Sequence, residues 1–532
     1  MTPTTLRKRF VNEENRRWWT LAAMCFALFM IMLDNTVVNV ALPSIQGDLG
    51  ASISGLEWTV NAYTLSFAVL LVTGGRLGDI FGRRRMFLFG VVTFGLSSAF
   101  IGFSQSEAWL VGGRAVQGVG AAFMMPATLS IISNAFPPHE RGKAIGTWAG
   151  VSALALAIGP VVGGFLVENV SWQSIFFLNL PVAAIAVVVT LFATHESRDE
   201  TAPPSIDYAG VSTITVGLAA LVLALVQGNT WGWGSGRILG LLAVAALGLV
   251  AFVVLEARVA NPMVDFKFFR SRSFAGATIV AFIVSFSMLA TFFFFALYLQ
   301  NVRGYSPLQA GVRFLPMTAV IIVAGPIAGR LSDRIGPRPL MTIGLLLNAI
   351  SLFWQGHLEV DTGYANLLGA FVLMGLGMGL IMSPMSTAAM NAVDPTKAGV
   401  ASGVLSMSRM VGGTFGVAAM GALITGLGRH KLDESMPQLS EEARQKLADG
   451  LGAGATGGTG AVHDAVQQAF LYALNDGLRI AAVVAALGAV VAWLLIEARV
   501  PNRQPVHDVE SAEVGTGDGG SELAAAAETA LA

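Results

Sequence analysis

Fourteen apolar stretches follow one another along this chain of 532 residues, and each is close to the length that crosses a lipid bilayer. A membrane-spanning helix needs about 20 consecutive, mostly apolar residues. The stretches therefore predict an all-α membrane protein with fourteen transmembrane helices. The predicted spans are residues 18–41, 56–75, 85–103, 108–133, 144–167, 175–193, 208–227, 237–255, 274–299, 308–330, 340–356, 365–390, 400–427 and 477–496. The seventh and eighth contain glycines and are joined by a short connection, so a re-entrant hairpin is the alternative for that pair.

The composition excludes a soluble protein and indicates the lipid bilayer as the main partner. Hydrophobic residues make up 54% of the chain and charged residues 12%, whereas soluble domains contain about 25% charged residues. The net charge of −1 gives no basis for binding nucleic acid. The single cysteine, Cys25, excludes an intrachain disulfide and is expected to be a small buried hydrophobic residue.

Lysine and arginine gather in the connections that follow the even-numbered spans. Short cytoplasmic connections are enriched in these residues, so the pattern predicts cytoplasmic N- and C-termini in the plasma membrane. The first span is long and lacks the usual cleavage site, so we expect it to be retained rather than removed as a signal peptide. The basic residues of these connections are Arg83, Arg84, Arg85, Arg141, Lys143, Arg198, Arg258, Lys267, Arg270, Arg272, Arg334, Arg338 and Lys397.

One short pattern occurs twice and divides the chain into halves. Residues 75–84 read GRLGDIFGRR after the second span, and residues 329–338 read GRLSDRIGPR after the tenth. If the seventh and eighth spans are set aside, the copies occupy equivalent places in two six-span halves. Duplicated halves are common in transporters, which bind substrate near the midplane between them.

The spans and the repeat give the predicted domain organisation. It comprises a cytoplasmic N-terminus at 1–17, an N-terminal half at 18–193, two extra spans at 208–255 and a C-terminal half at 274–496. The C-terminal half includes a long external loop at 428–476. The acidic tail at 497–532, rich in Gly and Ala, is predicted to be disordered and cytoplasmic.

The repeated segment resembles the loop signature of the major facilitator superfamily, although Ile80 stands where that family often has a basic residue. Three further segments are similar to signatures of its fourteen-span drug:proton antiporter family (EmrB/QacA-like). These segments are LDNTVVNVALPSI at 33–45, GRAVQGVG at 113–120 and GPVVGG at 159–164, of which the last is associated with exporters. The resemblance covers nearly the whole chain and implies the major facilitator fold, with two six-helix halves plus two extra central helices.

The resemblance also implies a function. We expect a secondary active transporter, not an enzyme, that exports small hydrophobic or cationic drugs or antibiotics by alternating access in exchange for protons. No G-x-x-x-x-G-K-[ST] loop for ATP is present, so the expected driving force is a proton gradient and no cofactor or metal is needed. A monomer is expected. The alternatives are export of a lipid or endogenous metabolite in the same fold and, from other classes, an intramembrane enzyme or a channel.

Asp34 is the strongest candidate for a proton-coupling residue. An ionised carboxylate within a span is costly, so such residues usually face the protein interior and mark ion or substrate pathways. The alternative is a carboxylate that only bonds a neighbouring helix. Asn35 and Asn39 lie one turn apart and would either line the same cavity or tie helices together.

Arg114 is predicted to respond to the charge of Asp34, because a buried guanidinium needs a partner. Gln117 lies on the same helix face, since residues three apart are neighbours, and it is a candidate for the substrate cavity. The alternative is that Arg114 extends to the outer interface. Glu57, at the external start of the second span, is a candidate for the proton path or an interfacial residue.

Asp79 is predicted to lie in a gating loop with Gly75, Gly82, Arg83 and Arg84. Its charge would face the positive N-terminal end of the thirteenth span, near Gly399, and latch the two halves together. Arg83, Arg84 and Arg85 would anchor the loop at the anionic cytoplasmic leaflet.

The fifth span is predicted to contain the antiporter hinge. Gly159 and Gly163 have the spacing that lets helices approach closely, and Gly164 follows them. Pro160 removes one backbone hydrogen bond and can kink the helix. Close packing without any hinge is the alternative. Arg409, in a similar helix rich in small residues, is a candidate for the substrate cavity.

Overall fold

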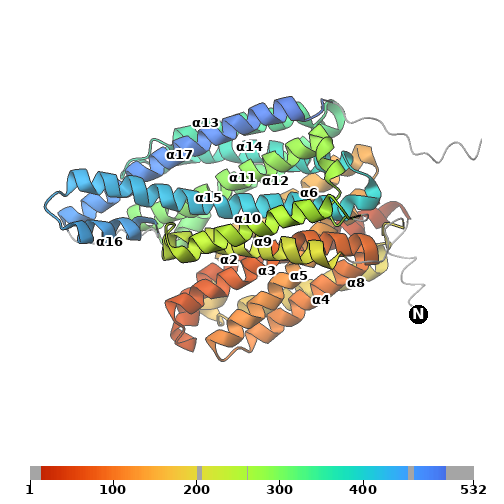
Figure 1. Ribbon diagram of the computed structural model, residues 1–532, viewed down its shortest axis with the longest axis horizontal. Helices are drawn as coiled ribbons and strands as arrows, with labels where there is room; N and C mark the ends of the chain where they lie inside the picture. The colour runs from red at the N-terminus through yellow and green to blue at the C-terminus, as the bar shows by residue number, and fades with distance from the viewer. Residues whose placement is uncertain (1–12, 201–206, 260–261, 453–459, 499–532) are drawn as a thin grey trace, which may run out of the picture. The chain divides into compact units, whose positions relative to one another are not determined.

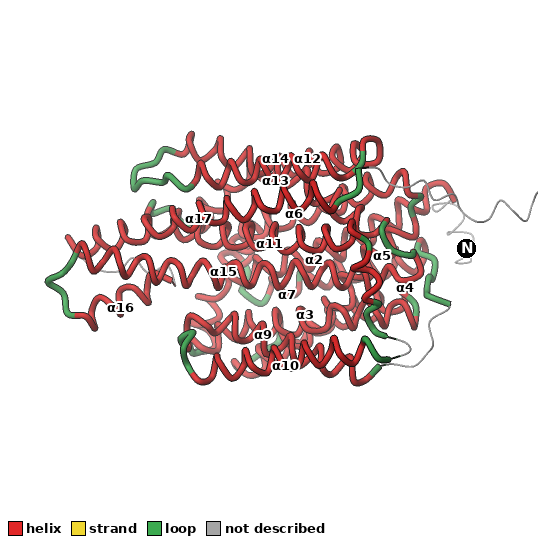
Figure 2. The backbone as a smooth tube through the Cα atoms, turned by 45° about the horizontal axis from the view of Figure 1, so that its top comes forward, coloured by secondary structure: helices red, strands yellow, loops and turns green. Residues whose placement is uncertain are grey.

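A computed structural model describes residues 13–200, 207–259, 262–452 and 460–498. Within these residues all regular structure is helical, and the helices run side by side with their connections at two ends (Figures 1 and 2). The predicted disordered tail, from residue 499 onward, lies outside the described residues.

The N-terminal half and the central pair contain nine helices among the described residues. They are α2 (Glu13–Leu49), α3 (Ile53–Phe81), α4 (Arg83–Gly102), α5 (Glu107–Ala135), α6 (Pro138–Asn169), α7 (Ser174–Phe177), α8 (Asn179–Ala193), α9 (Tyr208–Trp231) and α10 (Gly236–Glu256). The short helix α7 and α8 together form the predicted sixth span. The helices α9 and α10 are each long enough to cross a membrane, so the re-entrant alternative for this pair is wrong.

The C-terminal half follows the same plan with longer helices at its end. Its elements are η1 (Phe266–Arg270), α11 (Arg272–Leu297), η2 (Tyr298–Val302), α12 (Pro307–Ile335), α13 (Pro337–Gln355), α14 (Tyr364–Asn391), η3 (Pro395–Lys397), α15 (Ala398–Ser435), α16 (Glu441–Gly452) and α17 (Ala461–Leu495). Ser306 begins α12 with a capping box, in which its hydroxyl accepts from Gln309 N while the Gln309 side chain accepts from Ser306 N.

The number of helices that qualify as spans by length and apolar composition is twelve in the described residues, or thirteen if the bent helix α6 is one span. The prediction was fourteen. The eleventh predicted span corresponds to α13, which has 19 residues and includes Asn348 and Gln355, so its composition is less apolar. It nevertheless packs along α14 and α17 within the C-terminal half.

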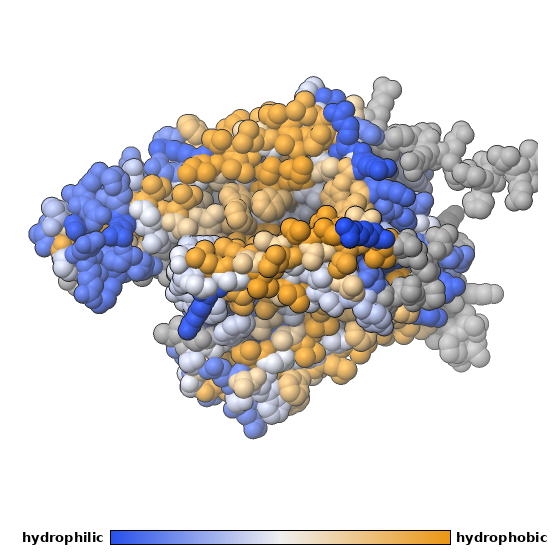
Figure 3. Space-filling view, viewed as in Figure 1, coloured by the Kyte–Doolittle hydropathy of each residue, from blue (hydrophilic) through white to orange (hydrophobic). Residues whose placement is uncertain are grey.

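The lateral surface of the bundle is apolar. Leu96 of α4 and Leu247 of α10 are exposed by 67% and 71%, as side chains facing lipid would be. Figure 3 shows apolar side chains over the middle of the visible face and polar ones at the end formed by α15, α16 and α17. Lipid is the natural solvent for such a surface.

The predicted external loop is helical over most of its described part, so the prediction of a loop at 428–476 is wrong. Helix α15 continues to Ser435 and α17 begins at Ala461, so both extend beyond the predicted spans (Figure 1). Ion pairs stabilise this region: Arg444 bonds Asp433 at 3.1 Å and joins α16 to α15. Charge pairs one turn apart, such as Lys446 with Glu442, favour helix over loop.

One end of the bundle carries the basic connections, and we call it the basic end. Among the described residues it comprises residue 82, residues 136–137, 194–200, 207, 257–259, 262–271, residue 336 and residues 392–397. Contacts between these connections and nearby helix ends place them together. They are Arg16 Nε to the Ala193 carbonyl, Arg17 with Glu140, Arg83 Nη2 to the Thr396 carbonyl, and Lys397 with Asp265.

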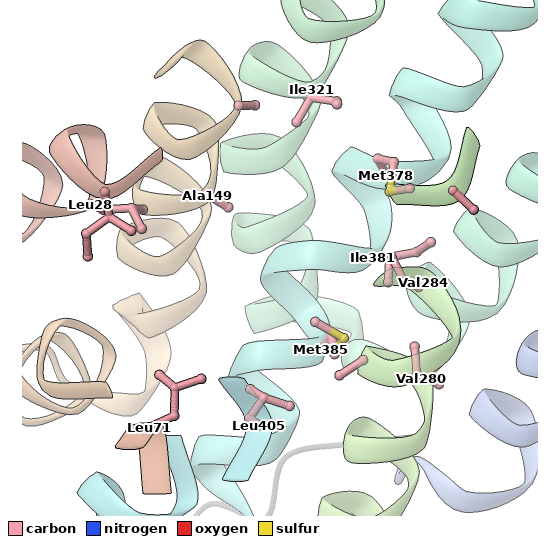
Figure 4. Packing of buried hydrophobic residues seen from close by; sticks show 14 of the residues in the cluster. Leu28, Leu71, Ala149, Val280, Val284, Ile321, Met378, Ile381, Met385 and Leu405 are labelled. Carbon is pink, nitrogen blue, oxygen red and sulfur yellow. The ribbon is translucent and has the colours of Figure 1, made fainter. Parts of the chain in front are cut away.

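Among the described residues, the two halves meet most extensively through two helix pairs, α6 with α12 and α3 with α15. Glycines bring the backbones together: a side chain at Gly146 would collide with Gly325, and one at Gly403 with Leu71 and Val72. Leu71 of α3 lies beside Leu405 of α15 in the core (Figure 4). Helix α9 packs against both α3 and α15, so it contacts both halves.

Candidate functional site

The centre of the N-terminal half contains a buried ion pair between α2 and α5. Asp34 and Arg114 are exposed by only 4% and 1%. Arg114 Nη1 donates to Asp34 Oδ2 at 2.5 Å, and Gln117 Nε2 donates to Asp34 Oδ1 at 2.9 Å. The structure therefore brings Arg114 and Gln117 onto Asp34, and the response of Arg114 to the charge of Asp34 stays a prediction.

Arg114 makes further contacts with α3 and with its own helix, α5. Its Nε donates to the Thr59 carbonyl of α3 at 3.0 Å, and Nη1 donates to Gln117 Oε1 at 2.6 Å. The guanidinium also lies 4.2 Å from the ring centroid of Tyr63, a cation–π contact. The alternative that Arg114 extends to the outer interface is therefore wrong.

Three residues of this network were missed by sequence reasoning. Asn179, from α8, donates to Ser98 Oγ of α4 at 3.2 Å and lies 3.5 Å from Asp34 Oδ1. Ser98 also accepts from Gln117 at 2.8 Å. Tyr63 is fully buried, and its hydroxyl has no hydrogen-bond partner within the described residues. A buried orphan hydroxyl costs about 1–3 kcal/mol, so this network is not satisfied throughout.

The other polar candidates of α2 and α3, which are Asn35, Asn39 and Glu57, lie outside the network around Asp34 and Arg114. Asn35 donates to the Ile31 carbonyl and Asn39 to the Asn35 carbonyl, both within α2. The alternative that these amides tie helices together is therefore wrong. Glu57 is exposed at the start of α3.

Asp79, in the first copy of the repeated motif, joins the two halves at the basic end. It accepts from the Gly399 and Val400 backbone N–H groups at 2.9 and 2.8 Å. Arg83 donates to the same carboxylate through Nε at 2.9 Å and Nη2 at 2.7 Å. The predicted contact with the N-terminal end of α15 is confirmed, and a carboxylate there is favoured by the helix dipole.

Arg83 is not a lipid anchor, which corrects that prediction. It is exposed by 1%, and its Nη2 also donates to the Pro395 and Thr396 carbonyls of the other half at 2.9 and 2.6 Å. A residue that neutralises the buried Asp79 cannot remain at the lipid surface. Arg84 is partly buried and donates to the Leu191 carbonyl, whereas Arg85 is exposed.

The glycines of the motif have defined roles. Gly82 has φ +107°, so it connects α3 to α4 through a single residue in a conformation that favours glycine. Gly75 faces the Gly399 carbonyl so closely that a Cβ would collide with it. A third chain segment supports the turn, because Glu196 Oε1 accepts from Arg84 N at 3.0 Å and Ser197 O accepts from Arg83 N at 2.9 Å.

The second copy of the motif makes the equivalent contact more weakly. Asp333 Oδ1 accepts from Gly142 N at the start of α6, at 3.2 Å. Gly336 repeats the single-residue connection with φ +87°. Pro337 stands where the first copy has Arg83, so this carboxylate has no arginine at the matching position. The two contacts between the halves are therefore unequal.

A further contact links the segment before α11 to the start of α15. Lys397 Nζ lies 2.9 Å from Asp265 Oδ2. Burial by itself raises the pKa of the Asp265 carboxyl, but the hydrogen bonds from Lys397 and from the Lys267 backbone outweigh it and hold the pKa below its usual value.

The glycines of α6 pack against two different helices. Gly142 and Gly146 face α12 of the other half, whereas Gly159 and Gly163 face Thr36 and Val37 of α2. Gly164 faces open space, so it is not part of a close contact. The helix axis bends by 40° between Pro138–Leu156 and Val161–Asn169, which places the predicted kink beside Pro160.

Arg409 lies in α15 and faces α6. Its guanidinium is 5.7 Å from the ring centroid of Trp148, and its Nη2 lies 3.4 Å from Ser406 Oγ. It therefore lies at the seam between the halves, and its place in a substrate cavity stays a prediction. The structure does not bring it into the Asp34 network.

Taken with the apolar surface, the paired six-helix halves and the charged contacts between them define a membrane transporter rather than an enzyme. Residues 24–417 match the family described as the Major Facilitator Superfamily. The chain belongs to this superfamily.

Similar proteins are antibiotic resistance and export proteins. The chain is 36% identical to the tetracenomycin C resistance and export protein of Streptomyces glaucescens, over 92% of this chain and 94% of that protein. It is 38% identical to the puromycin resistance protein pur8 of Streptomyces alboniger, over 78% of this chain and 83% of the relative. The crystal structure of a double-tryptophan XylE mutant has the same fold, with a TM-score of 0.61, 13% identity and coverage of 91% and 96%.

Proposed function

We propose that this protein exports a small drug or antibiotic across the plasma membrane in exchange for protons. The observation that carries the proposal is the buried Asp34–Arg114 ion pair. It lies in a polar network to which α2, α4, α5 and α8 contribute side chains. Charged groups at such depth usually serve ion or substrate pathways. The export function of the relatives supports the direction of transport.

Proton binding would act through the partners of Asp34. The ionised carboxylate accepts hydrogen bonds from Arg114 and Gln117. Protonation removes its charge, and Arg114 is then left with neutral partners only, the Thr59 carbonyl and Gln117 Oε1. A buried cation without a counter-charge is costly, so the protonated state favours a rearrangement of α2 against α5.

The contacts at the basic end would convert that rearrangement into alternating access. Positive charge marks the cytoplasmic side, so we assign the basic end to the cytoplasm. The glycine contacts named above, Gly75 with Gly399 and Gly146 with Gly325, lie toward this end. The conformation described here is therefore closed to the cytoplasm, and export requires the Asp79 and Asp333 contacts to break and re-form. The protein acts as a monomer, without a cofactor.

Reconstituted vesicles test the proposal. Tetracenomycin C and puromycin are the first substrates to try, because relatives carry resistance to them. Wild-type protein should move substrate when a pH gradient is imposed and stop when an ionophore collapses it. Asp34→Asn should abolish the gradient-driven movement but retain substrate exchange at equal pH. Transport that proceeds at the same rate without a gradient would disprove proton exchange.

A further inference from the structure

Arg409 lies near the middle of the membrane and forms no ion pair with an acidic residue in the described part of the chain. It is eleven residues beyond the first residue of α15, Ala398, which corresponds to about 17 Å along a helix. The hydrocarbon core is about 30 Å thick, so this depth is close to its midplane. Charged side chains at such depth face the protein interior or an aqueous space and are generally functional.

The described residues leave the hydrogen-bonding capacity of Arg409 largely unused. Among them, no Asp or Glu forms an ion pair with Arg409, and its buried Nε has no partner. The contact with Ser406 Oγ is long, at 3.4 Å. Across the seam, the indole N–H of Trp148 is also buried and has no acceptor among the residues that the structure describes. Two donors, one from each half, are therefore without acceptors.

Two other arginines with buried side chains show what a structural arginine looks like in this protein. Arg83 and Arg114 are each exposed by 1%, and each bonds a carboxylate within 2.7 Å. Arg409 differs on both counts, since it is partly exposed and has no such carboxylate. A guanidinium that only supported packing would need a counter-charge, because an uncompensated charge in this environment is strongly destabilising.

The position of these donors matches a substrate site between the halves. Gly403, where α15 contacts α3, lies six residues before Arg409, and Trp148 lies between Gly146 and Gly150 on α6. Arg409 and Trp148 therefore lie next to the glycine contacts that close the seam toward the basic end. A molecule bound to both would contact both halves at once, as alternating access requires.

We propose that Arg409 and Trp148 form a subsite for the acidic group of a transported molecule, namely a carboxylate or phenolate on an apolar body. The inference rests on the export function proposed above and adds a substrate class to it. The planar guanidinium can donate two parallel hydrogen bonds to a carboxylate, which gives both strength and orientation. The Trp148 N–H supplies a neutral donor, and the indole ring supplies apolar surface.

Two dyes of the same ring system separate charge recognition from general binding. Fluorescein is an acid, and rhodamine 6G is a cation whose carboxyl is esterified. Fluorescence anisotropy with purified full-length protein should give saturable fluorescein binding, and Arg409→Gln should raise the ratio of the fluorescein Kd to the rhodamine 6G Kd at least about tenfold. Arg409→Lys, which keeps the charge but loses the planar donor pair, should cause a smaller rise. Trp148→Phe keeps an aromatic ring without the donor and should also raise the ratio.

Arg429→Gln is the matched control, because Arg429 lies on the same helix, α15, but pairs with Glu441 at 3.2 Å outside the predicted span. It should leave the Kd ratio unchanged. An unchanged ratio in Arg409→Gln and Trp148→Phe, or the absence of saturable fluorescein binding to folded wild-type protein, would overturn the proposal. If Arg409→Gln fails to fold, the Arg409→Lys and Trp148→Phe ratios decide. Proton-driven efflux of rhodamine 6G, which lacks an acidic group, tests the export function separately.

Discussion

Asp34 Oδ2 of α2 and Arg114 Nη1 of α5 lie 2.5 Å apart, although 80 residues separate them in the sequence. Both side chains are buried, so each provides the counter-charge that the other needs. The pair therefore has two roles that can be measured separately, one in stability and one in transport.

We predict that Arg114→Ala destabilises the protein by about 3–5 kcal/mol, because it leaves the Asp34 carboxylate buried without compensation. Adding Asp34→Asn should restore much of that stability but not gradient-driven transport. Thermal unfolding in detergent, followed by intrinsic fluorescence, measures the first effect. Equal stability of the single and double variants, or normal coupled efflux by Arg114→Ala, would contradict this account.

We predict that the two motif copies respond unequally to loss of their acids. Asp79→Asn leaves Arg83 buried without a counter-charge, whereas Asp333→Asn removes a charge that accepts only backbone hydrogen bonds, from Gly142 and Lys143. The first substitution should open the basic end in most molecules, and the second should shift the equilibrium only a few-fold, about 1 kcal/mol.

Cysteine labelling can measure this opening. The buried Cys25 is the only cysteine, so Cys25→Ser gives a background without thiols. A cysteine introduced at Thr396, which contacts Arg83, should react with a water-soluble maleimide much faster in Asp79→Asn than in Asp333→Asn. Equal labelling rates in the two variants would show that the contacts are equivalent.

We predict that Gly75→Val prevents closure of the basic end. A Cβ at this position would collide with the Gly399 carbonyl, and forcing extra atoms into a packed contact costs about 1–3 kcal/mol. Export should fall about tenfold or more, while the protein still folds. Gly240→Val on α10 is the control, since its Cβ would meet nothing within 4 Å. A large loss of export in the control, or none in Gly75→Val, would contradict the prediction.

We predict that Glu196→Ala weakens the start of α4. Its carboxylate accepts from Arg84 N at 3.0 Å, as a helix-capping side chain does, and the loss of such a cap costs about 0.5–2 kcal/mol. The thermal midpoint of Glu196→Ala should be lower than that of the wild type. The midpoint of Glu196→Gln should fall less, because glutamine retains an acceptor oxygen. If both variants lose the same stability, the carboxylate acts through its charge near Arg85 rather than as a cap.

Much of the fold could be predicted because the sequence of a membrane protein shows the length of each apolar stretch and the charged residues within it. Asp34 and Arg114 are conspicuous as charges within apolar runs, and Gln117 follows from helical spacing. Asn179, Ser98 and Tyr63 are uncharged polar residues on other helices, and nothing in their linear order shows that they face Asp34. Such partners become visible only when the helices are packed.

Other differences have equally local causes. Arg83 belongs to a basic run, so the general enrichment of arginine on one side of the membrane concealed its buried ion pair. The segment after residue 428 is charged and was predicted as a loop. However, opposite charges four residues apart, such as Glu442 and Lys446, are also typical of an exposed helix. Span counting from composition was weakest for α13, which carries Asn348 and Gln355 within 19 residues.

The glycine contacts between the halves imply that closure is abrupt. At Gly75 and Gly146 the main chains of opposite halves touch directly, with no long side chain between them that could stretch to follow a separation. Dispersion attraction declines steeply, and a gap of about 0.5–1 Å already loses a quarter to a half of it. Half-open forms would therefore be poorly populated, and the rate of switching should depend on temperature as a single cooperative step does.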